Sequence, residues 1–139
     1  MSQNLLFDQV AVGQLMPELS IDITSRLIVG AAIATRDYQD VHHDQDRARE
    51  LGSPDIFMNI LTTNGFVGRY VTDWTGPRSV LKKVSIRLGA PNYPGAVMTI
   101  SGEVTAKNQD DDTVVLKVVG KNSLGNHVQG SVTVALPKE

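Results

Sequence analysis

The stretch DIFMNILTTNGFVGRYVTDW, residues 55–74, decides the fold. Its apolar residues recur at helical spacing, so they line one face of a single long helix. Thr75-Gly76-Pro77 follows and predicts the end of that helix, because glycine and proline both interrupt helical hydrogen bonding. We therefore expect one long helix that is largely buried. The residues on its buried face are Ile56, Phe57, Ile60, Leu61, Val67, Tyr70, Val71 and Trp74.

The chain after this helix is typical of β-strand. Four runs rich in β-branched residues follow one another, separated by short polar segments. Residues 109–112 and 124–126 have the composition of hairpin turns, so the last three runs form an antiparallel meander. The four predicted strands are Val80–Leu88, Val97–Lys107, Thr113–Asn122 and His127–Leu136.

The chain before the helix alternates between strand and helix. A turn is predicted at residues 13–17, and the alternation of Leu19, Ile21 and Ile23 with polar residues then predicts a half-buried strand. Residues 24–35 have helical spacing, with Thr24 or Ser25 as the cap. A short surface helix is predicted at residues 46–51, where Gly52 stops it.

Helices that precede an antiparallel meander indicate an α+β domain. The one long helix must bury its apolar face, and a curved antiparallel sheet wrapped around it does so. This arrangement is the hot-dog fold, and we expect residues 1–139 to form a single domain of this type. Because the sheet has open edges, a dimer or a pseudo-symmetric heterodimer is expected.

Composition excludes several classes of protein. The chain has 139 residues, 41% hydrophobic and 20% charged, with a net charge of −2 and no cysteine. These values exclude a disordered chain, a disulfide scaffold and a cysteine nucleophile. The slightly acidic balance argues against duplex nucleic acid as a partner. No apolar run is long enough to span a membrane and no signal peptide is visible, so a cytoplasmic protein without a membrane partner is expected.

The polar segment RDYQDVHHD, residues 36–44, holds the candidate chemistry. It allows three interpretations: a solvated loop, a metal site, or an acid–base pair made by Asp37 and His42. Adjacent histidines on an extended segment point to opposite sides, which disfavours joint ligation, and we expect no metal. The residues that a metal would use are Asp40, His42, His43 and Asp44. The third histidine, His127, lies beside a predicted turn and is expected to be exposed.

Residues 37–42, followed by Ala48 and Gly52, resemble the signature of the MaoC-like (R)-specific enoyl-CoA hydratases. In that family an aspartate and a histidine five residues apart are catalytic, and a small residue follows the histidine six positions later. The resemblance continues through residues 87–95 and 100–104, and so covers nearly the whole chain. It implies an enzyme that adds water across the 2,3 double bond of a 2-enoyl-CoA.

The resemblance also implies roles for individual residues. Asp37 and His42 would hold the water together, and the backbone N–H of Asn59 would bind the thioester oxygen. CoA is part of the substrate, so no separate cofactor is expected. Its phosphates need basic residues, and Lys83 and Arg87, which share one face of their predicted strand, are the candidates, with a solvated polar face as the alternative. Ser53-Pro54-Asp55 has the composition of a helix start, which would place the Asn59 amide inside the helix. The family pattern starts the helix near Met58 and leaves that amide free, and we follow the family.

Residues 34–44, 55–61 and 69–74 are similar to the small subunits of the bacterial steroid side-chain enoyl-CoA hydratases. These form a heteromeric branch of the family, so the similarity implies a second MaoC-like subunit and a steroid side-chain thioester. The common motif has glycine before the aspartate, asparagine two residues after it, and then proline. This chain has Arg36, Gln39 and Asp40 there, and Asn59 where a glycine is usual. These departures make a homodimeric hydratase of linear enoyl-CoAs the weaker alternative.

Two further classes share the expected fold. Hot-dog acyl-CoA thioesterases generally carry a carboxylate on the central helix, but residues 56–72 contain no acid. A non-catalytic subunit that only covers the sheet edge of a partner would not need both Asp37 and His42. The enoyl-CoA hydratase therefore remains the preferred interpretation.

Overall fold

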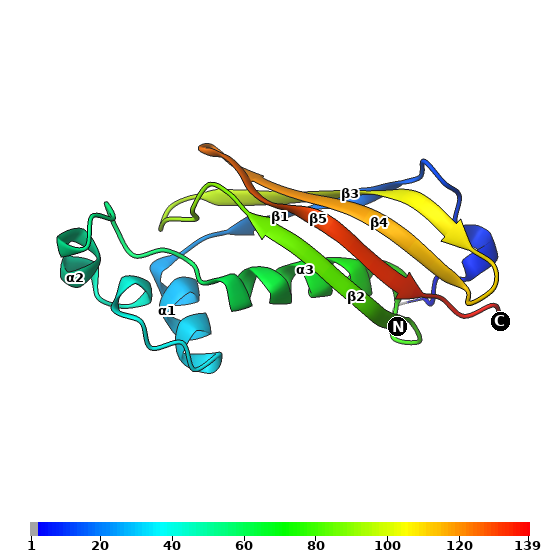
Figure 1. The fold of residues 1–139 in the computed structure, drawn as a ribbon, viewed down its shortest axis with the longest axis horizontal. Helices are drawn as coiled ribbons and strands as arrows, with labels where there is room; N and C mark the ends of the chain where they lie inside the picture. Colours follow the sequence, from blue (N-terminus) through cyan, green and yellow to red (C-terminus); the bar gives the residue numbers. More distant parts are fainter. Residues whose placement is uncertain (1–2) are drawn as a thin grey trace.

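The computed structural model describes residues 3–139, which form one antiparallel sheet and one long helix packed against it. The strand order is β1-β3-β4-β5-β2, and every neighbouring pair is antiparallel. Figure 1 shows α3 running along one face of the curved sheet, with α1 and α2 beyond one end of it. This confirms the predicted α+β hot-dog architecture. The elements are η1 (Phe7–Gln9), β1 (Leu15–Asp22), α1 (Ser25–Ala34), η2 (Asp40–His42), α2 (Gln45–Glu50), α3 (Ile60–Thr75), β2 (Val80–Leu88), β3 (Val97–Asn108), β4 (Thr113–Asn122) and β5 (Gly125–Ala135).

The central helix begins later than its apolar pattern suggests. The first helical residue is Ile60, and Asn59 caps the helix by accepting a hydrogen bond from Thr62 N–H. The start at Ser53-Pro54-Asp55 is therefore wrong, and the start near Met58 is confirmed. The physical reason is that the N–H groups of Phe57 and Met58 bond to other parts of the chain, which holds residues 56–59 extended.

The buried face of α3 is also narrower than predicted. Val67, Tyr70 and Val71 are buried, but Ile60 and Leu61 are 47% and 46% exposed and that part of the prediction is wrong. Both exposed residues lie in the first turn, near the end of the sheet where the helix projects towards α1 and α2 (Figure 1).

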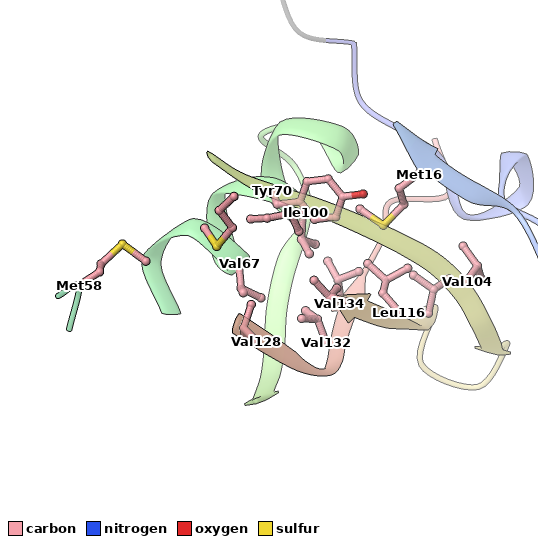
Figure 2. Packing of buried hydrophobic residues seen from close by; sticks show 14 of the residues in the cluster. Met16, Met58, Val67, Tyr70, Ile100, Val104, Leu116, Val128, Val132 and Val134 are labelled. Carbon is pink, nitrogen blue, oxygen red and sulfur yellow. The ribbon is translucent and has the colours of Figure 1, made fainter. Parts of the chain in front are cut away.

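The core lies between α3 and the concave face of the sheet. Figure 2 shows Val67 and Tyr70 of α3 facing Ile100, Leu116 and Val132 from the three central strands. All five are less than 5% exposed. Burial of such side chains typically stabilises a protein by about 1.5–3 kcal/mol each, so this layer fixes α3 against the sheet.

The segment before α3 follows its predicted pattern with one correction. The predicted turn at residues 13–17 ends too late, because Leu15, Met16 and Pro17 are already in β1. A proline is compatible with this strand because β1 is at the sheet edge and its register shifts between Met16 and Leu19. The helix predicted after it is confirmed as α1, where Thr24 accepts the capping hydrogen bond from Leu27 N–H at 3.0 Å.

The strand β2 forms the second edge of the sheet and is largely exposed. It carries four exposed apolar side chains, so this edge is the most apolar uncovered part of the sheet. None of the helices in residues 3–139 combines the length and apolarity needed to cross a membrane. The exposed apolar residues of β2 are Val80, Leu81, Val84 and Leu88.

Candidate active site

Asp37 is placed by the turn that ends α1. Arg36 N–H donates to the carbonyl oxygen of Ile33 at 3.0 Å, and Asp37 N–H donates to that of Ala32 at 2.9 Å. These two bonds form a Schellman motif, which needs a left-handed residue at its centre. Arg36 holds that conformation with φ of 58°, where a residue other than glycine is disfavoured by roughly 1–2 kcal/mol. The carboxylate of Asp37 therefore leaves the helix end in a fixed direction.

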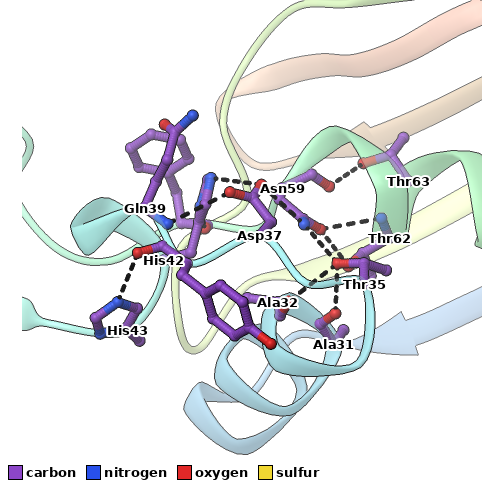
Figure 3. A network of polar contacts seen from close by, with 12 residues as sticks. Ala31, Ala32, Thr35, Asp37, Gln39, His42, His43, Asn59, Thr62 and Thr63 are labelled. Atoms are coloured by element: carbon purple, nitrogen blue, oxygen red, sulfur yellow. Dashed lines mark hydrogen bonds and ion pairs between the residues drawn. The ribbon is translucent and has the colours of Figure 1, made fainter.

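His42 is held in one tautomer. Its Nδ1 lies 2.7 Å from the carbonyl oxygen of Phe57, which can only accept, so Nδ1 carries a proton, and in the neutral ring Nε2 is the nitrogen that accepts. The Phe57 ring packs edge-on against the imidazole, with ring centres 5.0 Å apart. Nε2 then lies 3.3 Å from Oδ2 of Asp37, and the two side chains are 7% and 18% exposed. Figure 3 shows this pair at the centre of a polar network.

The side chain of Asn59 joins the start of α3 to this pair. Its Oδ1 accepts from Thr62 N–H at 3.0 Å, while its Nδ2 donates to Oδ2 of Asp37 at 3.1 Å and to Oγ1 of Thr35 at 2.9 Å (Figure 3). The backbone N–H of Asn59 has no acceptor within residues 3–139, as is usual for the free N–H groups at a helix start. Asn59 thus has two roles: its side chain holds the carboxylate of Asp37, and its backbone offers a free N–H donor. The sequence indicated only the second of these.

These groups line one cavity with a volume of about 330 Å³. It lies where the start of α3, the segment that carries Asp37 and His42, and the segment after β2 come together. Three of the predicted site residues, Asp37, His42 and Asn59, therefore converge. The lining residues are Asp37, Gln39, His42, Phe57, Met58, Asn59, Ile60, Leu88, Gly89, Pro91 and His127.

His127 also lines this cavity, and its predicted exposure is wrong. It is 2% exposed, with Nδ1 2.7 Å from the carbonyl oxygen of Ala90 and Nε2 2.8 Å from Oγ1 of Thr63. Burial lowers the pKa of His127, although the bond to Ala90 opposes this effect. The register between β4 and β5 shifts beside Gly120, so His127 is an extra residue and its ring turns inward together with Val128. Strict alternation along the strand would have placed the ring of His127 on the outer face of the sheet. The amino-acid sequence gives no indication of the register shift.

Lys83 and Arg87 do not line the cavity. The register of β2 shifts after Leu81, so Lys82 is an extra residue, and the pairing is regular from Lys83 to Leu88. Lys83 and Arg87 pair with Thr133 and Gln129, on the sheet face opposite to the core. Arg87 lines a separate hollow together with Gln129. The assignment of both cations to CoA therefore stays a prediction.

The adjacent histidines face different parts of the structure. The Nε2 atom of His43 lies 3.1 Å from the carbonyl oxygen of Tyr38, on the far side of the loop from His42 (Figure 3). Among residues 3–139, no group of three or more histidine or acidic side chains is arranged to hold a metal ion. The contacts of Asp37 and His42 with each other, with Asn59 and with Phe57 hold this part of the loop.

Comparison with a similar protein and with a solved structure identifies the family of this chain. No family model matches the chain. The 3-oxo-4,17-pregnadiene-20-carboxyl-CoA hydratase beta subunit of Mycobacterium tuberculosis is 51% identical over 125 residues, which cover 90% of this chain and 95% of that protein. The crystal structure of the ChsH1-ChsH2 complex from the same organism contains a chain that is 51% identical, with a TM-score of 0.87 over 91% of this chain and 98% of that one. The chain belongs to the MaoC-like hydratase family.

More distant structures share the fold of this MaoC-like hydratase. The R-hydratase PhaJ1 from Pseudomonas aeruginosa, in its unliganded form, matches with a TM-score of 0.89 at 20% identity, over 98% of this chain and 88% of that one. At this identity the match concerns the fold alone.

The arrangement suits a hydratase chemically. A bare imidazole nitrogen beside a carboxylate can hold one water molecule and remove its proton. A free backbone N–H at a helix start can stabilise negative charge on an oxygen atom. The acid on α3, Asp73, is exposed and pairs with Arg69 at 3.1 Å, so the helix offers the cavity no carboxylate of the thioesterase kind.

Proposed function

We propose that this chain is the catalytic subunit of a heteromeric enoyl-CoA hydratase that acts on a steroid side-chain thioester. The observation that carries the proposal is the contact between His42 Nε2 and Asp37 Oδ2 in the wall of a cavity that Asn59, whose backbone N–H is free, also lines. The relative with 51% identity carries the name of a steroid-type hydratase subunit, which supports the choice of substrate.

The reaction adds one water molecule to a polarised double bond. His42 Nε2 accepts a proton from the water that His42 and Asp37 hold together, and the water oxygen bonds to C3. The electron pair of the double bond moves onto the thioester oxygen, where the Asn59 N–H stabilises the charge. The enolate then collapses, and the Asp37–His42 pair returns a proton to C2. Water is consumed, and the pair ends in its starting protonation state.

A partner subunit is part of this proposal. The solved ChsH1-ChsH2 complex contains two different subunits. In this chain the exposed apolar residues of β2 offer an edge to a second sheet. The cavity has a volume of about 330 Å³ and is not fully enclosed, so most of a bulky acyl group would lie beyond it, against a surface that the second subunit supplies. A homodimer acting on linear enoyl-CoAs is the alternative.

The test is hydration of a steroid 2-enoyl-CoA by this chain, alone and with a MaoC-like partner. The reaction is monitored as the loss of absorbance of the conjugated thioester. We expect activity only with the partner, and a fall of about 10²-fold or more in both Asp37→Asn and His42→Ala. The matched control is His43→Ala, which removes the neighbouring histidine that points away from the pair and should keep the wild-type rate.

Two other results would change the assignment. Turnover of short linear enoyl-CoAs by the chain alone would favour the homodimeric hydratase. Wild-type rates in both Asp37→Asn and His42→Ala would remove the catalytic pair from the mechanism.

A further inference from the structure

His127 is a second histidine in the cavity, and the proposed reaction gives it no step. Its ring is buried between two walls of the site. On one side Nδ1 meets the carbonyl oxygen of Ala90, whose neighbours Gly89 and Pro91 line the cavity. On the other side Nε2 meets the hydroxyl of Thr63, in the first turn of α3. The ring therefore links these two walls directly.

The direction of both hydrogen bonds is fixed by chemistry. A carbonyl oxygen can only accept, so the ring proton is on Nδ1 and is donated to Ala90. Nε2 is then bare, and Thr63 must donate its hydroxyl hydrogen to it. Burial favours the neutral ring that this pattern needs, because it lowers the pKa of His127.

Thr63 connects this ring to the proposed oxyanion donor. It is fully buried, and its N–H donates to the carbonyl oxygen of Asn59 at 3.3 Å, which closes the first turn of α3. The Thr63 hydroxyl has a single hydrogen, and its bond to His127 is much shorter than its 3.4 Å distance from the same carbonyl oxygen. The hydroxyl therefore ties the first turn to β5.

The opposite wall is tied to the same strand. Gly89 N–H donates to the carbonyl oxygen of His127, and Ala90 N–H donates to that of Asn126, both at 2.8 Å. Residue 92 then reaches back to the helix start, because Asn92 accepts from Met58 N–H at 3.1 Å. The side chain of His127 thus contacts both walls.

We infer that His127 and Thr63 are positioning residues: their hydrogen bond sets the place of the Asn59 N–H relative to the Asp37–His42 pair. The inference rests on the proposed function, because it assigns the Asn59 N–H to the thioester oxygen. Misplacing a donor by about 1 Å can lower a rate by about 10²-fold, so a small shift of this turn matters.

Two variants of Thr63 test the inference, and they differ in whether the side-chain hydroxyl is kept. Thr63→Val has nearly the same shape without the hydroxyl, and Thr63→Ser keeps the hydroxyl. In the assembled enzyme we expect Thr63→Val to lower kcat by at least about tenfold, with KM changed less than about threefold. Thr63→Ser should restore kcat to within about threefold of the wild type. Equal kcat in the valine and serine variants would overturn the inference.

His127→Gln tests whether the two residues act together. If they do, the double variant with Thr63→Val loses no more kcat than the worse single variant, whereas independent sites give the product of the two losses. A multiplicative loss would show that Thr63 does not act through His127.

A spectroscopic measurement separates this inference from the hydratase proposal. In ¹H–¹⁵N NMR spectra of the wild type, His127 should carry its proton on Nδ1, and the Asn59 amide should shift in Thr63→Val and stay in place in Thr63→Ser. An unmoved Asn59 amide in Thr63→Val overturns the inference whatever the substrate. If instead Asp37→Asn keeps full activity while the amide shifts as expected, the proposed function fails and the coupling between Thr63 and Asn59 stands.

Discussion

His127 shows how one buried side chain can make stability depend on pH. In the unfolded chain its ring is in water and has the ordinary pKa of 6.5, whereas burial lowers the pKa in the folded state. Below pH 6.5 the unfolded chain therefore binds a proton that the folded chain does not. The contribution of this residue to stability is fully present above pH 6.5, and it is lost as the pH falls towards the folded pKa.

We expect the free energy of unfolding to fall more steeply between pH 7.5 and pH 5.5 in the wild type than in His127→Gln, which cannot titrate. Urea unfolding at the two pH values measures both changes, and the difference between them isolates His127 from the other histidines. Equal changes in the two proteins would show that the ring of His127 is as easily protonated in the folded state as in the unfolded chain.

At the residue scale, a motif with fixed spacing predicted which side chains lie close together. Asp37 and His42 stand five residues apart in a recognisable signature, and the structure brings their side chains together. The same reasoning missed the ring of His127, because a one-residue shift between β4 and β5 turns it inward. It also missed the role of the Asn59 side chain, because its partner Asp37 is 22 residues away in the sequence.

At the scale of single elements, the cap of α3 serves both the helix and the site. Asn59→Ala removes the acceptor for Thr62 N–H, which should lower the free energy of unfolding by about 1 kcal/mol. Asn59→Ser keeps a capping oxygen and should retain most of that stability. Chemical denaturation of the two variants measures the difference, and equal stability would show that the cap contributes little.

Helices and strands could be predicted where the local sequence alone determines them. The strands β2 to β5 were found from their β-branched runs, and β2 and β4 have their predicted limits. The start of α3 was ambiguous, because Ser53-Pro54-Asp55 has a good local start signal while long-range hydrogen bonds to Val41 and Asn92 hold the next residues extended. Tertiary contacts decide such a case, and no local pattern contains them.

At the scale of the whole molecule, the edge strand β2 is the surface where we expect the partner subunit. Val84 is on the core-facing side of this strand but is 36% exposed at the sheet edge, so a lysine there can extend to solvent in the isolated chain and places a charge where a second sheet would pack. We expect Val84→Lys to prevent assembly with a MaoC-like partner while the melting temperature of the chain alone stays unchanged. Size-exclusion chromatography with light scattering measures the assembly.

Val12→Lys is the matched control, because Val12 is also exposed but lies in a turn outside the sheet. It should assemble as the wild type does. Assembly of Val84→Lys with wild-type affinity would place the partner on another surface.

The turn at Arg36 has a consequence for how relatives of this chain can be recognised. Two backbone hydrogen bonds to Ile33 and Ala32 set the direction of the Asp37 carboxylate, and neither bond depends on the side chain at position 36. Glycine suits this turn best, yet Arg36 adopts the same backbone shape at a modest cost. A search pattern that demands glycine before the aspartate would pass over this chain. A search for a helix that ends at a residue with left-handed backbone conformation would retrieve it, if the next residue must be acidic and a histidine must stand five positions after that acid.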